Sequence, residues 1–120
     1  MPERAFEAAT SRSIPEVKAD LFRALAHPAR IRVLEVLAEG ERSVGAMLPL
    51  LEIEASNLSQ QLAVLRRAGL VTTRKEGSSV IYAIRDPALA ELLAAAKRVL
   101  VNSLAETKGL LEGLESGARS

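Results

Sequence analysis

The chain has 120 residues, which is enough for one domain with a modest core. Hydrophobic residues make up 48% of it and aromatic residues only 2%, so Ala, Leu and Val must fill the interior, which favours packed helices. The absence of cysteine excludes disulfides, thiolate metal sites and redox thiols. The sequence shows no secretory signal and no apolar run of membrane-spanning length, so we expect a cytoplasmic protein without membrane contact.

Positive charge gathers in one segment, although the net charge is only +1. Residues 56–85 contain five basic side chains against the single acidic Glu76, whereas acidic residues are in slight excess on either side. Such a concentration is expected of a surface that binds phosphate. Five charges are also compatible with an ordinary solvated face, so charge alone leaves both interpretations open.

The N-terminal part of the chain predicts a flexible arm followed by two helices. Residues 1–13 show no periodicity and form the expected arm. Pro15 suits the first turn of a helix, and apolar side chains then recur at helical spacing. Pro28 opens the second helix with His27 as its N-cap, and Gly40 ends it.

Two further helices and a β-hairpin are predicted next. Ser43 can cap a third, short helix, and the fourth occupies residues 56–68 before Gly69. The period then changes to two, and the turn sequence E-G-S-S separates strands expected at 70–75 and 80–85.

A long helix completes the chain. Asp86 is a good N-cap and Pro87 a good first residue, and the helix is expected to extend to about Leu114. Residues 115–120 are then a flexible tail. The predicted order is α-α-α-α-β-β-α, a mainly helical winged helix-turn-helix with a small β-hairpin, over residues 14–114.

The fourth helix carries the most specific feature of the sequence. Leu58, Leu62 and Leu65 form one narrow stripe that must face the core. Elsewhere the helix has amides and hydroxyls, mainly in its N-terminal half, and no carboxylate, which suits base edges in the major groove of DNA. An ordinary surface helix is the alternative, but such helices usually carry Glu and Lys. The outer face and its flanks hold Asn57, Ser59, Gln60, Gln61 and Arg67.

The predicted hairpin is basic and can grip DNA beside the helix. Arg74, Lys75, Ser78 and Ser79 surround a glycine that can take the positive φ of a tight turn. Basic side chains here can reach phosphate or enter a minor groove, and a plain solvated hairpin tip is the alternative. Arg67 can contact phosphate or merely complement the negative C-terminal end of its helix.

Three blocks of the sequence resemble the ArsR/SmtB-type bacterial transcriptional regulators. They are L-F-R-A-L-A-H-P-A-R-I-R-V-L-E-V-L (21–37), S-N-L-S-Q-Q-L-A-V-L-R-R-A-G-L-V (56–71) and G-S-S-V-I-Y-A-I (77–84). The resemblance covers roughly residues 17–104. It implies a winged-helix homodimer that represses promoters by binding inverted-repeat operators in double-stranded DNA. The family's DNA-reading positions fall here on Ser56, Asn57, Ser59, Gln60 and Gln61, with the wing at 74–79.

The metal sites of metal-sensing family members do not carry over to this chain. The thiolate site lies in the block that corresponds to residues 41–47, which has no cysteine. The other common site uses Asp and His pairs on the last helix, which here has Asp86 and Glu91 but no histidine. We therefore predict no metal and no cofactor, and the effector is unknown. His27, the only histidine, is expected to be structural.

The last helix also predicts a dimer. Leucines recur over roughly 28 residues, a rod of about 40 Å that one small domain cannot bury. Part of this stripe is therefore expected to pair with a second chain. A twofold dimer would hold two recognition helices about one DNA turn, near 34 Å, apart and would bind a palindromic operator. The resemblance adds the first helix, and the expected interface comprises Val17, Leu21, Leu89, Leu93, Ala96, Leu100 and Leu104.

The leading hypothesis is thus a sequence-specific DNA-binding regulator that acts as a homodimeric repressor. The alternative is a winged-helix module that binds another protein and no specific DNA. An enzyme is not supported, because the sequence has no cysteine, no pair of histidines and no Gly-rich phosphate loop.

Overall fold

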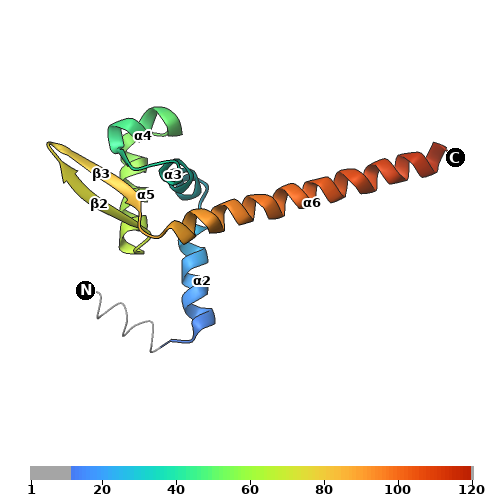
Figure 1. The fold of residues 1–120 in the computed structure, drawn as a ribbon, viewed down its shortest axis with the longest axis horizontal. Helices are drawn as coiled ribbons and strands as arrows, with labels where there is room; N and C mark the ends of the chain where they lie inside the picture. Colours follow the sequence, from blue (N-terminus) through green and yellow to red (C-terminus); the bar gives the residue numbers. More distant parts are fainter. Residues whose placement is uncertain (1–11, 120) are drawn as a thin grey trace.

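The structure is a computed structural model that describes residues 12–119 (Figure 1). Its elements are α2 (Ile14–Leu25), α3 (Pro28–Ala38), β1 (Arg42–Ser43), α4 (Val44–Leu51), α5 (Ala55–Arg67), β2 (Val71–Glu76), β3 (Ser79–Ile84) and α6 (Pro87–Arg119). The predicted winged helix-turn-helix order is confirmed: four helices precede the hairpin and a long helix follows it. The predicted boundaries are correct to within two residues, except at the C-terminal end of α6.

Side-chain caps determine where three of these helices begin. His27 Nδ1 accepts a hydrogen bond from the backbone N–H of Ala29 at 3.1 Å, so the only histidine caps α3 as predicted. Ser43 Oγ accepts from the N–H of Ala46 at 3.2 Å and caps α4. Asp86 Oδ1 accepts from the N–H two residues later at 2.9 Å at the start of α6. These short polar side chains satisfy N–H groups that have no partner within their helix.

The core lies where α3, α4 and α5 pack together beneath the sheet. The predicted stripe on α5 is confirmed, because Leu58, Leu62 and Leu65 are at most 2% exposed. Their burial fixes the rotation of α5 about its axis, and the opposite face is therefore turned to solvent. The remaining buried apolar side chains are Leu25, Val33, Leu34, Leu37, Met47, Leu51, Val71 and Leu89.

The hairpin belongs to a three-stranded antiparallel sheet with strand order β1-β3-β2. Strands β2 and β3 pair from Val71↔Ile84 to Glu76↔Ser79, so only Gly77 and Ser78 remain in the turn. Gly77 has a φ of +63°, which is the left-handed region that favours glycine. Strand β1 was not predicted, because two residues are too few to show the alternation that identifies a strand.

Helix α6 leaves the body of the molecule and projects as a rod (Figure 1). Its 33 residues span about 50 Å. It continues to Arg119, so the predicted end at Leu114 was wrong, because Gly and Ser weaken a helix interior without necessarily ending it. Only its first turns pack on the core, and the radius of gyration is 19.1 Å, against about 14 Å for a compact chain of this length. No helix within residues 12–119 has the length and apolar character needed to cross a membrane.

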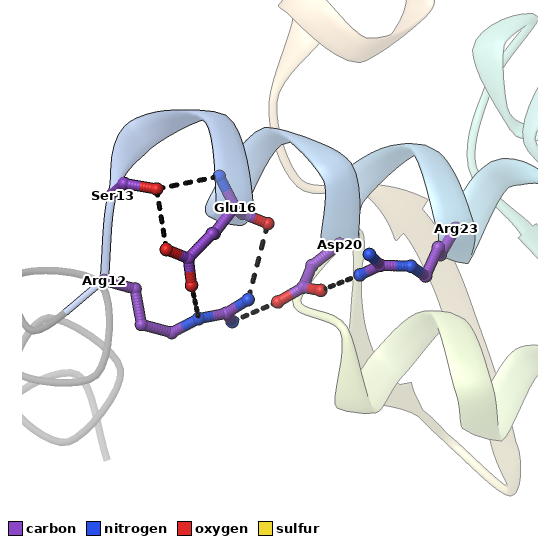
Figure 2. Close-up of polar contacts among 5 residues, drawn as sticks. All are labelled: Arg12, Ser13, Glu16, Asp20 and Arg23. Atoms are coloured by element: carbon purple, nitrogen blue, oxygen red, sulfur yellow. Dashed lines mark hydrogen bonds and ion pairs between the residues drawn. The ribbon is translucent and has the colours of Figure 1, made fainter.

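Helix α2 begins in a cluster of polar contacts (Figure 2). Ser13 Oγ accepts from the N–H of Glu16 at 3.3 Å and donates to its Oε1 at 2.9 Å, so Ser13 caps α2 and also bonds the side chain of its first turn. Arg12 forms ion pairs with Asp20 and, at 3.7 Å, with Glu16. Arg23 pairs with Asp20 from the other side. Residues 12 and 13 of the predicted flexible arm belong to this cluster, and residues 1–11 lie outside the described part of the chain.

Substituting Asp20 provides a test of this cluster that depends on pH. The hydrogen bond from Arg12, together with the charges of Arg12 and Arg23, holds the pKa of Asp20 below its ordinary value of 3.8. The carboxylate therefore stabilises the fold above that value, and its contribution is lost as the pH falls through the lowered pKa. We expect Asp20→Asn to reduce the free energy of unfolding slightly at neutral pH and to match the parent chain in strong acid.

Urea unfolding of the parent chain and of Asp20→Asn, at neutral pH and in strong acid and with and without added salt, measures the difference in free energy of unfolding. The effect is expected to be small and sensitive to salt, because the Asp20 side chain is 43% exposed. Glu106→Gln is the control, since it removes an exposed carboxylate that has no ion pair within residues 12–119. A deficit of Asp20→Asn that persisted unchanged in acid would contradict the electrostatic explanation.

Candidate nucleic-acid interface

The N-terminal half of α5 presents a polar surface without carboxylates. The leucine stripe points inward, and Ser56, Ser59 and Gln60 are consequently exposed, with Asn57 half-buried beside them. No Asp or Glu lies between Ala55 and Arg67. This surface offers hydrogen-bond donors and acceptors and no charge that would repel a phosphate.

Gln61 does not lie on this exposed surface. Its side chain is only 8% exposed, its Oε1 accepts from Nε of Arg30 at 3.1 Å, and its Nε2 donates to Oδ1 of Asn57 at 3.0 Å. The prediction that Gln61 lies at the flank of the outer face was therefore wrong. A helical wheel could not reveal this, because the buried amide is satisfied by an arginine on α3, 31 positions earlier.

The hairpin brings its polar residues to one end of the sheet. Lys75, Ser78 and Ser79 are exposed there. Arg74 pairs with Glu76 on the same strand at 2.6 Å and with Glu41 in the segment before β1. These carboxylates, Glu76 foremost, raise the pKa of Arg74 above its ordinary value. Arg74 is thus engaged by two carboxylates, whereas Lys75 forms no ion pair within the described residues.

The junction between α5 and β2 holds the helix and the hairpin in a fixed relation. Gly69 has a φ of +76°, and its N–H donates to the carbonyl of Arg66 at 3.0 Å. The next N–H, of Leu70, donates to the carbonyl of Leu65 at 3.0 Å, and the Leu70 carbonyl accepts from Arg85 at 3.1 Å. The chain therefore turns sharply from the helix into the sheet. Figure 1 shows the hairpin extending from this junction beside α5.

The last turn of α5 contains the two arginines of the helix. Arg66 and Arg67 are both exposed and belong to its last turn. Positive charge at this end complements the partial negative charge of the helix terminus. A phosphate contact by Arg67 stays a prediction, because both roles are compatible with its position.

Metal-ligating groups are dispersed in this part of the molecule. Within residues 12–119, no three His, Cys, Asp or Glu side chains lie close enough to hold a metal ion. The site therefore consists of amides, hydroxyls and basic side chains, which bind by hydrogen bonding and charge.

Comparison with known proteins identifies a helix-turn-helix domain in the part of the chain that contains the candidate interface. A family model described as a helix-turn-helix domain matches residues 25–74, which include α3, α4, α5 and the start of the wing. The chain is 51% identical over 108 residues to the HTH-type transcriptional regulator Rv0081 of Mycobacterium tuberculosis. That alignment covers 89% of this chain and 95% of the relative.

Solved structures are similar in fold as well. The crystal structure of M. tuberculosis Rv0081 has a TM-score of 0.72 at 52% identity, covering 79% of this chain and 96% of that one. The homodimeric winged helix-turn-helix DNA-binding domain of Mb0332 from Mycobacterium bovis, described as a possible ArsR-family regulator, has a TM-score of 0.70 at 31% identity, covering 78% and 86%. The transcriptional repressor BigR from Xylella fastidiosa has a TM-score of 0.65 at 32% identity, covering 82% and 95%.

The paired state of Arg74 leads to a prediction about the wing. Glu41→Gln removes one of its two carboxylate partners, and therefore one negative charge beside the hairpin. We expect non-specific DNA affinity to rise several-fold at low salt, and the slope of log K against log salt to steepen by up to about one. Fluorescence anisotropy with an arbitrary duplex over a salt series measures both quantities.

Glu39→Gln serves as the matched control for this substitution. Glu39 is two positions away but pairs with Arg42 at 3.4 Å, away from the hairpin tip. If Glu41→Gln and Glu39→Gln had the same affinity and the same slope, Arg74 would not lie near the bound phosphates.

Proposed function

Because the chain belongs to the ArsR/SmtB-type winged helix-turn-helix transcriptional regulators, we propose that it is a cytoplasmic, homodimeric repressor of an inverted-repeat operator. The observation that carries DNA reading is the surface of α5. It presents uncharged polar side chains, and the junction at Gly69 holds it beside a basic hairpin. A recognition helix and a backbone clamp require the same arrangement.

In this proposal the two parts of the interface have different tasks. The N-terminal half of α5 enters the major groove, where Asn57 and Gln60 contact base edges and the neighbouring serines add hydrogen bonds. The hairpin lies along the backbone, where Lys75 meets phosphate and the serines at 78 and 79 donate to it. Arg74 contributes only after its ion pairs open.

The proposed dimer rests on apolar surface that a single chain leaves in water. Leu100 and Leu104 on α6 are 65% and 70% exposed, and Ala96 is exposed between them and the core. Val17, Leu21 and Leu93 are partly buried in the single chain. Leu89 leaves the proposed interface, because at 7% exposure it belongs to the chain's own core. Phe22 joins it, since 55% of this residue is exposed on α2.

Two substitutions test the proposed contacts with DNA, one at a residue expected to contact bases and one at a residue expected to contact phosphate. Gln60→Ala should weaken binding to the preferred operator by about 5- to 150-fold and hardly change binding to a scrambled duplex. Lys75→Ala should weaken both complexes alike and reduce the salt slope by about one, because it removes a phosphate contact. Gel shifts with DNA from upstream of the chain's own gene, over a salt series, measure these effects.

Lys108→Ala is the control for charge, since Lys108 lies on the distal part of α6 and pairs there with Glu112. If the parent chain bound the upstream and scrambled duplexes equally well, the regulator hypothesis would be wrong and a protein-binding module would be favoured. A reporter gene under the upstream DNA tests the sign: expression of the chain should lower transcription if it is a repressor.

The dimer is tested by placing a charge in the apolar stripe. Leu104→Glu should shift the chain toward monomers in sedimentation analysis and weaken operator binding, because a carboxylate opposes burial against a second stripe. Ala105→Glu is the matched control, since it adds the same charge one position away on the same exposed helix. Equal dimer stability in both variants would remove the distal part of α6 from the interface.

A further inference from the structure

A part-buried series of hydrogen bonds connects α3 to the polar surface of α5. Arg30 donates from Nη1 to the carbonyl of Ala24 at 2.9 Å and from Nε to Oε1 of Gln61 at 3.1 Å. Gln61 donates from Nε2 to Oδ1 of Asn57 at 3.0 Å. Within the described residues, Gln61 is the only polar side chain in the buried core. Its position therefore requires these partners, since an unsatisfied amide would be costly there.

The chemistry of arginine fixes the direction of each hydrogen bond that links Arg30, Gln61 and Asn57. A guanidinium group only donates, so Gln61 must present its oxygen to Arg30. The Gln61 NH₂ group then faces Asn57, which must in turn present its oxygen. The NH₂ group of Asn57 is thereby left on the outer side, and within residues 12–119 it has no acceptor. The orientation of both amides follows from one obligate donor.

We propose that Arg30 and Gln61 are positioning residues that make Asn57 present a hydrogen-bond donor to DNA, so that Asn57 reads guanine. This rests on the proposed function. Guanine carries two neighbouring acceptors, N7 and O6, on its major-groove edge, and an NH₂ group directed outward fits that pattern. An unconstrained asparagine favours adenine, whose edge combines an acceptor and a donor. Arg30, which is only partly buried, thus determines base preference without touching DNA.

One nearly isosteric change can reverse the direction of the hydrogen bond between residues 61 and 57. In Gln61→Glu the introduced carboxylate accepts from Arg30 with one oxygen and turns its other oxygen toward Asn57. Asn57 must then rotate its amide and donate inward, which leaves its oxygen facing the groove. That oxygen accepts from the exocyclic amines of adenine and cytosine. We therefore expect the preferred base to change from guanine to adenine or cytosine.

Selection from a randomised duplex library with the full-length chain identifies the half-site. Asn57→Ala then identifies the base pair whose discrimination depends on Asn57. At that position the parent chain should prefer guanine by about tenfold, and 7-deazaguanine, which lacks the N7 acceptor, should abolish much of this preference. Gln61→Glu should lose the sensitivity to 7-deazaguanine and favour adenine or cytosine by a similar factor.

Two variants of Arg30 keep the test independent of how well Gln61→Glu folds. Arg30→Lys retains an obligate donor and should retain the guanine preference, whereas Arg30→Met removes the donor and should relax it. In the Asn57→Ala background, none of the Arg30 or Gln61 variants should change base preference. Thermal unfolding of each variant shows whether any loss of binding reflects loss of folded protein.

A merely structural role gives a different result. Variants that weakened binding equally at all four bases, or that altered preference equally without Asn57, would overturn the assignment. A parent chain that preferred adenine at the Asn57 position would also overturn it. If the library yielded no preferred sequence at all, the proposed function itself would fail, which is distinguishable from a specific operator whose Asn57 position ignores Arg30 and Gln61.

Discussion

The buried leucine stripe of α5 is the constraint from which the functional surface follows. Leu58, Leu62 and Leu65 are almost completely withdrawn from water, and burial of each is worth about 1.5–3 kcal/mol. Rotating α5 about its axis would expose them, so the helix has one stable orientation. The amides and hydroxyls on its other face are therefore held in place by contacts on the opposite side of the helix. The position of the hairpin depends on the same contacts, because the chain leaves α5 through hydrogen bonds to the carbonyl groups of Leu65 and Arg66.

The positive charge that this molecule offers to a partner depends more on which basic side chains are already paired than on how many there are. The segment rich in basic residues contains Arg74, yet that side chain is held between Glu76 and Glu41 and contributes little free positive charge. Arg30 is also engaged, although with neutral partners, and its charge faces an amide and a carbonyl. The basic character available to a partner therefore comes from fewer side chains than composition indicates. Uncharged hydrogen-bonding groups consequently carry most of the chemical information on the surface of α5.

Local signals in the sequence were sufficient for most of the fold. The caps at His27 and Ser43, the leucine stripe and the glycine turn of the hairpin all depend on residues within a few positions of one another. Contacts between distant segments could not be predicted in this way. Gln61 was misplaced because its partner lies 31 positions earlier, and the ion pair between Arg74 and Glu41 was missed because Glu41 lies 33 positions earlier. Such pairs have no periodic signature, so only the folded chain reveals them.

Because the leucines of α6 are exposed in a single chain, the length of this helix is expected to depend on the concentration of the protein. In a single chain the distal half of α6 is supported only by contacts within the helix itself, and an isolated helix of that length is only marginally stable in water. If a second copy covers the stripe, the same residues gain the apolar contacts that helices in proteins usually rely on. Helix content would then rise with chain concentration. The rod would be a product of assembly, and dilution would shorten it before the core and the recognition helix unfolded.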